Sequence, residues 1–90
     1  MRVILYSKTD CSQCDAFHFE LTDLQSEWGF VYEKRQLGPG DPLLVEWAGT
    51  FPVVEIAAAG SGQPLRLSSP TSQGQLRAEI RRAARVMEGG

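Results

Sequence analysis

The feature that most constrains this chain is a pair of cysteines, Cys11 and Cys14, placed where a strand-like segment gives way to a helical one. Residues 2–6 are predicted to form the first, central strand, because their β-branched, aliphatic and aromatic side chains are typical of a strand buried on both faces. After them, apolar side chains recur every three or four positions, as in an amphipathic helix, at Cys14, Phe17, Leu21, Leu24 and Trp28. Cys11 therefore falls at or near a helix N-terminus, where unpaired N–H groups stabilise a thiolate.

Size and composition indicate one globular domain. The 90 residues are 42% hydrophobic and 22% charged, and we predict a single domain over residues 1–88 with a frayed tail at 89–90. No apolar run approaches the roughly 20 residues of a membrane span, and the apolar start is shorter than a signal-peptide core of about 7–15 residues. The net charge of −2 lacks the basic surplus of a nucleic-acid-binding protein. We expect a cytoplasmic monomer that binds neither membrane nor nucleic acid.

The rest of the chain predicts three more strands and two more helices. Gly29 ends the first helix, and residues 30–37 form a second strand, parallel to the first because a helix joins them. Asp41 and Pro42 are typical of an N-cap and first helical residue, and predict a short helix that reaches Gly49. Residues 53–56 and 64–67 form the third and fourth strands, antiparallel across a glycine-containing hairpin loop at 57–63.

A final amphipathic helix is predicted by apolar residues on one face, at Leu76, Ile80, Ala83, Ala84 and Met87. Its start is signalled either by Ser69 and Pro70 or by the capping-box pattern of Ser72 and Gln75. The element order is thus βαβαββα. The fold class is α/β, with a four-stranded mixed sheet flanked by three helices.

Two cysteines three residues apart favour redox chemistry over a structural staple, because a disulfide between them closes almost no loop. The spacing brings both sulfurs within bonding reach across one helical turn. Cys11 is the expected nucleophile because the helix N-terminus and the nearby Lys8 stabilise its thiolate, and Cys14, one turn inside on the apolar stripe, is the expected resolving thiol. Two alternatives remain at this point. One is a pair of inert buried thiols. The other is a zinc site formed by Cys11, Cys14 and His18, for which the chain offers no fourth Cys or His ligand.

A second motif, Thr50-Phe51-Pro52, precedes the third strand. The chain resembles the compact glutaredoxin-like branch of the thioredoxin fold over essentially its whole length. The resemblance rests on this motif, on the element order and on residues 6–14, Tyr-Ser-Lys-Thr-Asp-Cys-Ser-Gln-Cys. The resemblance implies a thiol–disulfide oxidoreductase that reduces protein or small-molecule disulfides. It also implies that Pro52 is cis and lies against the cysteines, that the backbone of Phe51 pairs with an extended thiol substrate, and that Lys8 and Thr50 shape the site.

The sequence departs from glutaredoxins just before the last helix. Glutaredoxins carry there two glycines, a small residue and an aspartate, which hold the γ-glutamyl end of glutathione, whereas residues 68–72 are Ser-Ser-Pro-Thr-Ser. The chain also lacks the tryptophan that precedes the first cysteine in thioredoxin itself, and the Gly-Pro that lies there between the two cysteines. We expect no bound cofactor and either glutathione or a thioredoxin reductase as the electron donor. A non-enzymatic binding protein that keeps the fold is the competing hypothesis.

Two acidic residues, Asp10 and Asp15, flank the cysteine pair. A carboxylate beside Cys11 opposes formation of the thiolate, so we expect this thiol to be less acidic than in a typical glutaredoxin. Asp10 could in addition serve as the N-cap of the first helix, with Gln13 three residues later, and occupy the amides that would otherwise face the sulfur. Trp28 and Trp47 are expected to pack in the core or at its rim.

Overall fold

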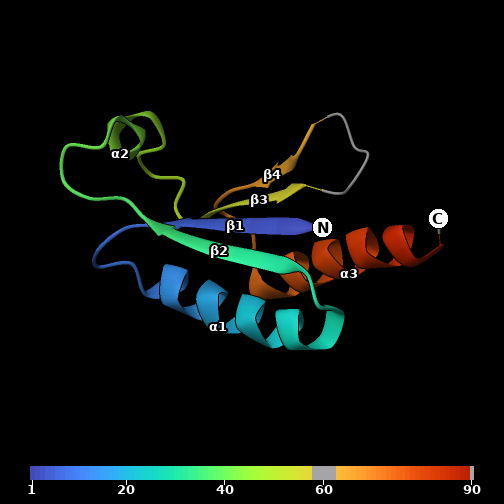
Figure 1. Ribbon diagram of the computed structural model, residues 1–90. Coiled ribbons are helices and arrows are strands. Elements are labelled where there is room, and N and C mark those ends of the chain that lie inside the picture. Colours follow the sequence, from blue (N-terminus) through green and yellow to red (C-terminus); the bar gives the residue numbers. More distant parts are fainter. Residues whose placement is uncertain (58–62, 90) are drawn as a thin grey trace.

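A computed structural model describes residues 1–57 and 63–89 of the chain, with side chains as far as Arg85. Its elements follow the predicted βαβαββα order (Figure 1). In chain order they are β1 (Arg2–Ser7), α1 (Ser12–Trp28), β2 (Val31–Gln36), α2 (Pro42–Glu46), β3 (Val53–Ala57), β4 (Leu65–Leu67) and α3 (Gln73–Gly89). Among these helices, none is both long enough and apolar enough to cross a lipid bilayer.

The four strands form one mixed sheet in the order β2-β1-β3-β4. β1 pairs in parallel with β2, with Arg2 opposite Val31, and antiparallel with β3, with Leu5 opposite Val54. β3 and β4 are antiparallel, as predicted. Most of the predicted hairpin loop between them, residues 58–62, lies outside the described residues. The predicted fold class, including the mixed sheet, is confirmed.

Both long helices cover the same face of the sheet (Figure 1). Successive side chains of a strand point to opposite faces, and the fully buried Val3 and Leu5 of β1 point toward α1 and α3. They pack there against the predicted apolar stripes of the two helices, which include Leu21, Leu76 and Ile80. This core fixes the depth at which α1 lies on the sheet, and so the position of its first turn.

The helix ends show which local signals the fold uses. Gly29 caps α1 in the left-handed conformation, with φ of 74°, and its N–H donates to the carbonyl of Gln25 at 2.7 Å. Asp41 caps α2 as predicted, because its side chain accepts from the N–H of Leu43 at 2.9 Å. The predicted extension of α2 to Gly49 is wrong, since Trp47 is its C-cap and Gly49 turns the chain with φ of 81°.

The start of α3 decides between the two predicted caps. Ser72 and Gln75 form the capping box: the N–H of Gln75 donates to Oγ of Ser72 at 3.1 Å, and the N–H of Ser72 donates to Oε1 of Gln75 at 2.8 Å. The Ser69–Pro70 bond is cis and belongs to the preceding turn. At its other end α3 includes Gly89, so the helix runs one residue beyond the predicted domain end.

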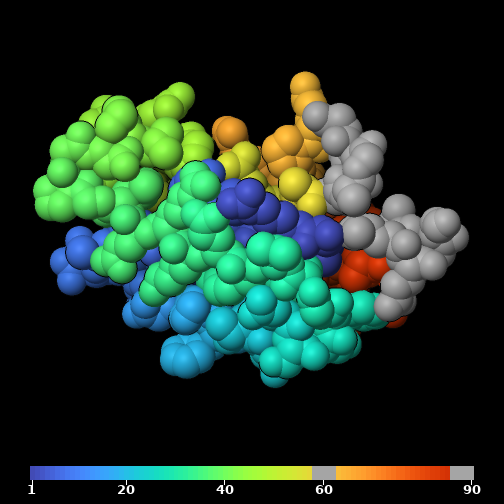
Figure 2. Space-filling view, viewed as in Figure 1, coloured from blue at the N-terminus to red at the C-terminus, as the bar shows by residue number. Residues whose placement is uncertain are grey.

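The short helix α2 lies at one end of the sheet. It stands on the side away from α1 and α3, and the space-filling view shows it with its flanking segments as a lobe beside the ends of β1 and β2 (Figure 2). None of its residues is fully buried, but Leu43, Leu44 and Trp47 pack against a second buried cluster that contains Cys14. The cysteines thus lie where this small lobe meets the two-layer body of the protein.

Candidate active site

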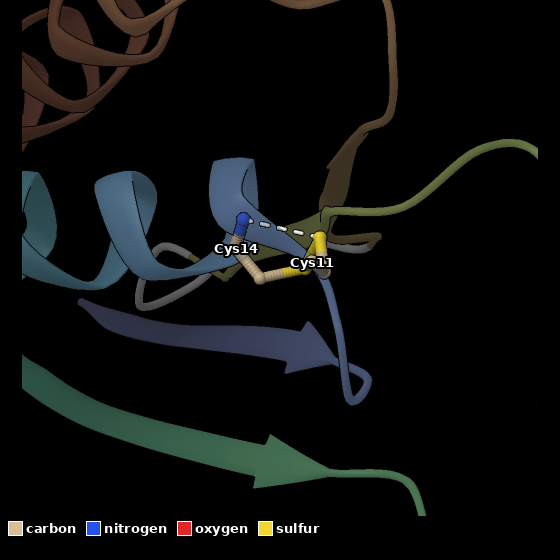
Figure 3. The surroundings of a disulfide bond; sticks show 2 residues. All are labelled: Cys11 and Cys14. Carbon is tan, nitrogen blue, oxygen red and sulfur yellow. Dashed lines mark hydrogen bonds between the residues drawn. A yellow bond between two sulfur atoms is a disulfide. The ribbon is translucent and has the colours of Figure 1, made fainter.

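Cys11 is the N-cap of α1. Its backbone is extended, and Sγ accepts a hydrogen bond from the N–H of Cys14 at 3.2 Å (Figure 3). The alternative in which Asp10 caps the helix is therefore wrong. Asp10 has φ of 56° and turns the chain from β1 toward the helix, which places the cysteine rather than the aspartate over the first free amides. A sulfur at this position faces the positive end of a helix of 17 residues.

The two cysteines are joined by a disulfide, with their Cα atoms 5.3 Å apart. Their surroundings differ: Cys14 is 1% exposed, whereas Cys11 is only partly buried. Cys14 is held among Tyr6, Leu37 and Val53 in the second cluster. An incoming reagent can therefore reach the outer sulfur of Cys11 while the inner sulfur stays covered.

The Thr50-Phe51-Pro52 segment lies against this cluster, and the Phe51–Pro52 bond is cis, as the resemblance implied. Thr50 is anchored on both sides. Its N–H and Oγ1 donate to the carbonyl of Trp47 at 3.0 and 2.6 Å, and its own carbonyl accepts from the N–H of Ser69 at 2.9 Å. By contrast, no hydrogen bond to the amide or carbonyl of Phe51 occurs among the described residues. Phe51 is 8% exposed, and its pairing with an extended thiol substrate, which the resemblance implied, stays a prediction.

An open cavity of about 680 Å³ adjoins Cys11 on the side of β2. Both lysines of the chain, Lys8 and Lys34, line it together with Asp10 and Asp15. Lys8 is exposed, and its Nζ lies 5.9 Å from the centre of the Phe51 ring, so it reaches from the loop before Cys11 toward the segment before Pro52. The structure thus brings all six residues singled out from the sequence to one place, namely Lys8, Cys11, Cys14, Thr50, Phe51 and Pro52.

Three residues that lie beside this region, Trp47, Glu55 and Arg66, were not connected with it by sequence reasoning. Trp47 packs edge-on against Tyr6 with ring centres 5.0 Å apart and contacts Phe51 at 6.4 Å, and the guanidinium of Arg66 lies 5.0 Å from its ring centre. The pKa of the Tyr6 phenol is raised, first by burial and then by the carboxylate of Glu55 beside it. The helical spacing of Leu43, Leu44 and Trp47 was the available signal, but it could not show which strands they meet.

The zinc alternative makes His18 a metal ligand beside the two cysteines, and the contacts of His18 do not support this. Nδ1 of His18 lies 2.8 Å from the hydroxyl of Tyr32 on β2, on the flank of α1. In the part of the chain that the structure describes, no group of three or more His, Cys, Asp or Glu side chains could hold a metal ion. The disulfide occupies both sulfurs that this alternative requires.

Comparisons with known proteins place this geometry in a known fold. The sequence matches no family model and no curated protein. Among solved structures, thioredoxin 1 from the thermophilic eubacterium Thermosipho africanus TCF52B is similar with a TM-score of 0.76 at 16% identity, over 98% of this chain and 99% of that chain. A structure described as that of a malarial protein has a TM-score of 0.67 at 19% identity, over 91% of this chain and 94% of the other. The chain has the thioredoxin fold, with a Cys-x-x-Cys pair at the start of its first helix.

Proposed function

We propose that this protein is a glutaredoxin-like thiol–disulfide oxidoreductase that reduces protein or small-molecule disulfides through Cys11 and Cys14. The observation that carries the proposal is the asymmetry of the pair at the start of α1. Cys11 is partly exposed and accepts a hydrogen bond from the N–H of Cys14, whereas the sulfur of Cys14 is buried behind it. One sulfur is suited to attack and leave, and the other to resolve.

The proposed reaction is a two-step thiol–disulfide exchange that ends with the Cys11–Cys14 disulfide. The thiolate of Cys11 attacks one sulfur of the substrate disulfide, and the other substrate sulfur leaves as a thiolate that takes up a proton. Cys14, deprotonated, then attacks the mixed disulfide at the sulfur of Cys11 and releases the second substrate thiol. The substrate gains two electrons, and the protein ends with the Cys11–Cys14 disulfide that the structure contains. A thiol donor returns two electrons and restores the dithiol.

The substrate lies across the segment before Pro52. An extended peptide can pair with the free amide and carbonyl of Phe51, which orients its cysteine toward Cys11. Thr50 holds this segment through its bonds to Trp47 and Ser69, and Lys8 closes the opposite side above the Phe51 ring. In this role Lys8 also places a positive charge near the cavity beside the reacting sulfur.

For the electron donor, we favour a thioredoxin reductase, with glutathione as the alternative. Glutaredoxins hold glutathione at the start of the last helix. In this chain, residues 68–72 before α3 are Ser-Ser-Pro-Thr-Ser, and Ser72 forms the capping box with Gln75. The amides of Ser72 and Gln75 already donate within that box, so they do not offer a free pair to a carboxylate. Either donor operates in the cytoplasm, which is the location we propose for the protein.

Activity assays with cysteine variants test the proposal. We expect the wild type to reduce 2-hydroxyethyl disulfide and insulin, and Cys11→Ser to lose the activity completely. Cys14→Ser should accumulate a mixed disulfide with the substrate, because nothing resolves it. Turnover with thioredoxin reductase and with glutathione plus its reductase then identifies the donor.

The competing binding-protein hypothesis makes the opposite prediction. If wild type and Cys11→Ser are equally inert toward both disulfides, and Cys14→Ser traps no substrate, the enzymatic proposal is wrong. Circular dichroism that shows folded proteins, and thiol counting that shows a reduced Cys11–Cys14 dithiol in the wild type at the start of the assay, exclude misfolding and prior oxidation as the cause.

A further inference from the structure

Trp47, the C-cap of α2, is held from two sides by residues of the sheet. The edge-on contact with Tyr6 of β1 has ring centres 5.0 Å apart, and the Arg66 guanidinium of β4 stacks 5.0 Å from the indole. Both contacts are of the geometry in which aromatic and cation–π attractions operate. The indole is thus clamped between residues that lie 60 positions apart in the sequence.

Glu55 of β3 connects the two sides of this clamp. It is opposite Arg66 in the strand register and its carboxylate lies 3.7 Å from the guanidinium. The same carboxylate lies beside the Tyr6 phenol. Trp47, Arg66, Glu55 and Tyr6 therefore form a closed ring of contacts, which we call the tryptophan clamp. It joins α2 to β1, β3 and β4 on the face of the sheet opposite α1 and α3.

The clamp bears directly on the segment before Pro52. The carbonyl of Trp47 accepts both hydrogen bonds donated by Thr50, and the indole contacts the Phe51 ring at 6.4 Å. Between Trp47 and Thr50 the chain passes through Gly49 with positive φ, so the helix itself does not continue into this segment. The position of Phe51 relative to Cys11 consequently depends on where the indole of Trp47 is held.

We propose that Trp47, held by Arg66 and Glu55, is a positioning residue that fixes the Phe51 backbone for pairing with extended peptide disulfides. This inference rests on the proposed function and deepens it, because it makes polypeptide disulfides the substrates that depend on the clamp. A small disulfide makes no strand pairing with Phe51 and needs only access to the sulfur of Cys11. The two substrate classes therefore respond differently to loss of the clamp.

The test compares the steady-state kinetics of variants on two substrates, a decapeptide with an internal disulfide and 2-hydroxyethyl disulfide. For Arg66→Gln and Trp47→Leu we expect KM for the peptide to rise about three- to tenfold, with kcat/KM for the small disulfide unchanged within about twofold. Arg66→Lys keeps the charge but loses the planar stacking, so we expect an intermediate KM. Trp47→Phe keeps an aromatic ring that can contact Tyr6 and Phe51, so we expect its KM for the peptide to stay closer to that of the wild type than to that of Trp47→Leu. Arg82→Gln, an exposed arginine of α3, is the matched control.

Two results would overturn the inference. One is an equal loss on both substrates in the Arg66 variants, which indicates general damage to the site. The other is an unchanged peptide KM in both Arg66→Gln and Trp47→Leu, which shows that the clamp does not position Phe51. Failure of the proposed function itself looks different, because the wild type then reduces neither substrate.

Discussion

The backbone N–H of Cys14 donates a hydrogen bond to Sγ of Cys11 at 3.2 Å, so the residue that we propose as the nucleophile is also the cap of the helix that carries it. A capping side chain usually satisfies an amide that would otherwise lack a partner. In the proposed reaction, the same contact would stabilise negative charge on the sulfur of Cys11 once the disulfide opens. Capping and reactivity thus depend on one geometry, and substitutions near it bear on both.

The acidic neighbours of Cys11 give a first prediction. In a Cys14→Ser background, Asp10→Asn should speed alkylation of Cys11 at pH 7 about two- to fivefold, because it removes a negative charge beside the forming thiolate. Asparagine suits this position, since Asp10 has φ of 56° and asparagine tolerates that backbone well. Iodoacetamide kinetics measure the effect, with Asp23→Asn further along α1 as the control. Equal rates in all three proteins would show that the flanking carboxylate has no influence.

The C-cap of α1 gives a second prediction. Gly29→Ala should lower the free energy of unfolding by about 1 kcal/mol, because a Cβ is strained at φ of 74°. Gly38→Ala is a matched control: neither glycine has an atom within 4 Å of an added Cβ, but Gly38 lacks the positive φ. We expect the control to change stability by less than about 0.5 kcal/mol in urea unfolding. Similar losses in both variants would contradict the left-handed cap.

The capping box of α3 gives a third prediction. Ser72→Ala removes the acceptor for the N–H of Gln75 and should cost about 1 kcal/mol of stability. Gln75→Ala removes the reciprocal bond, and the double variant should lose less than the sum, since the two contacts support one turn. Urea unfolding measures all three, with the exposed Gln73→Ala as the reference substitution. Strictly additive losses would argue against a cooperative box.

Tyr32 gives a prediction about alkaline pH. Burial raises its pKa to about 12, whereas in the unfolded chain the phenol ionises near its ordinary value of 10.0. The stability that the protonated Tyr32 phenol gives the folded state is fully present below pH 10. It is lost as the pH rises toward 12, because in this range the unfolded state releases the proton while the folded state keeps it. We expect the stability of wild type to fall more steeply than that of Tyr32→Phe between these values in urea unfolding. Parallel slopes, or phenolate absorbance that appears fully near pH 10, would contradict the raised pKa.

Much of the fold could be predicted because its signals are local. The three- and four-residue spacing of Phe17, Leu21 and Leu24 favours a helix through contacts within a few turns, and Ser72 with Gln75 forms a box within one turn. The end of α2 was misplaced for the opposite reason. Trp47 leaves the helix to pack on Tyr6, which lies on another element, and helical periodicity contains no information about that contact.

At the site, the local features could be recognised from the order of the amino acids: two cysteines one turn apart after a buried strand, a proline after Phe51, and a lysine before Cys11. Local spacing is enough to bring the two sulfurs of Cys11 and Cys14 together. The three-dimensional structure was needed to show that Cys11 rather than Asp10 caps the helix, that Trp47 packs on Tyr6, and that Arg66 reaches Trp47. The cap depends on the turn that the chain makes at Asp10, and the two contacts of Trp47 depend on strand register, which is set by packing between residues far apart in the chain.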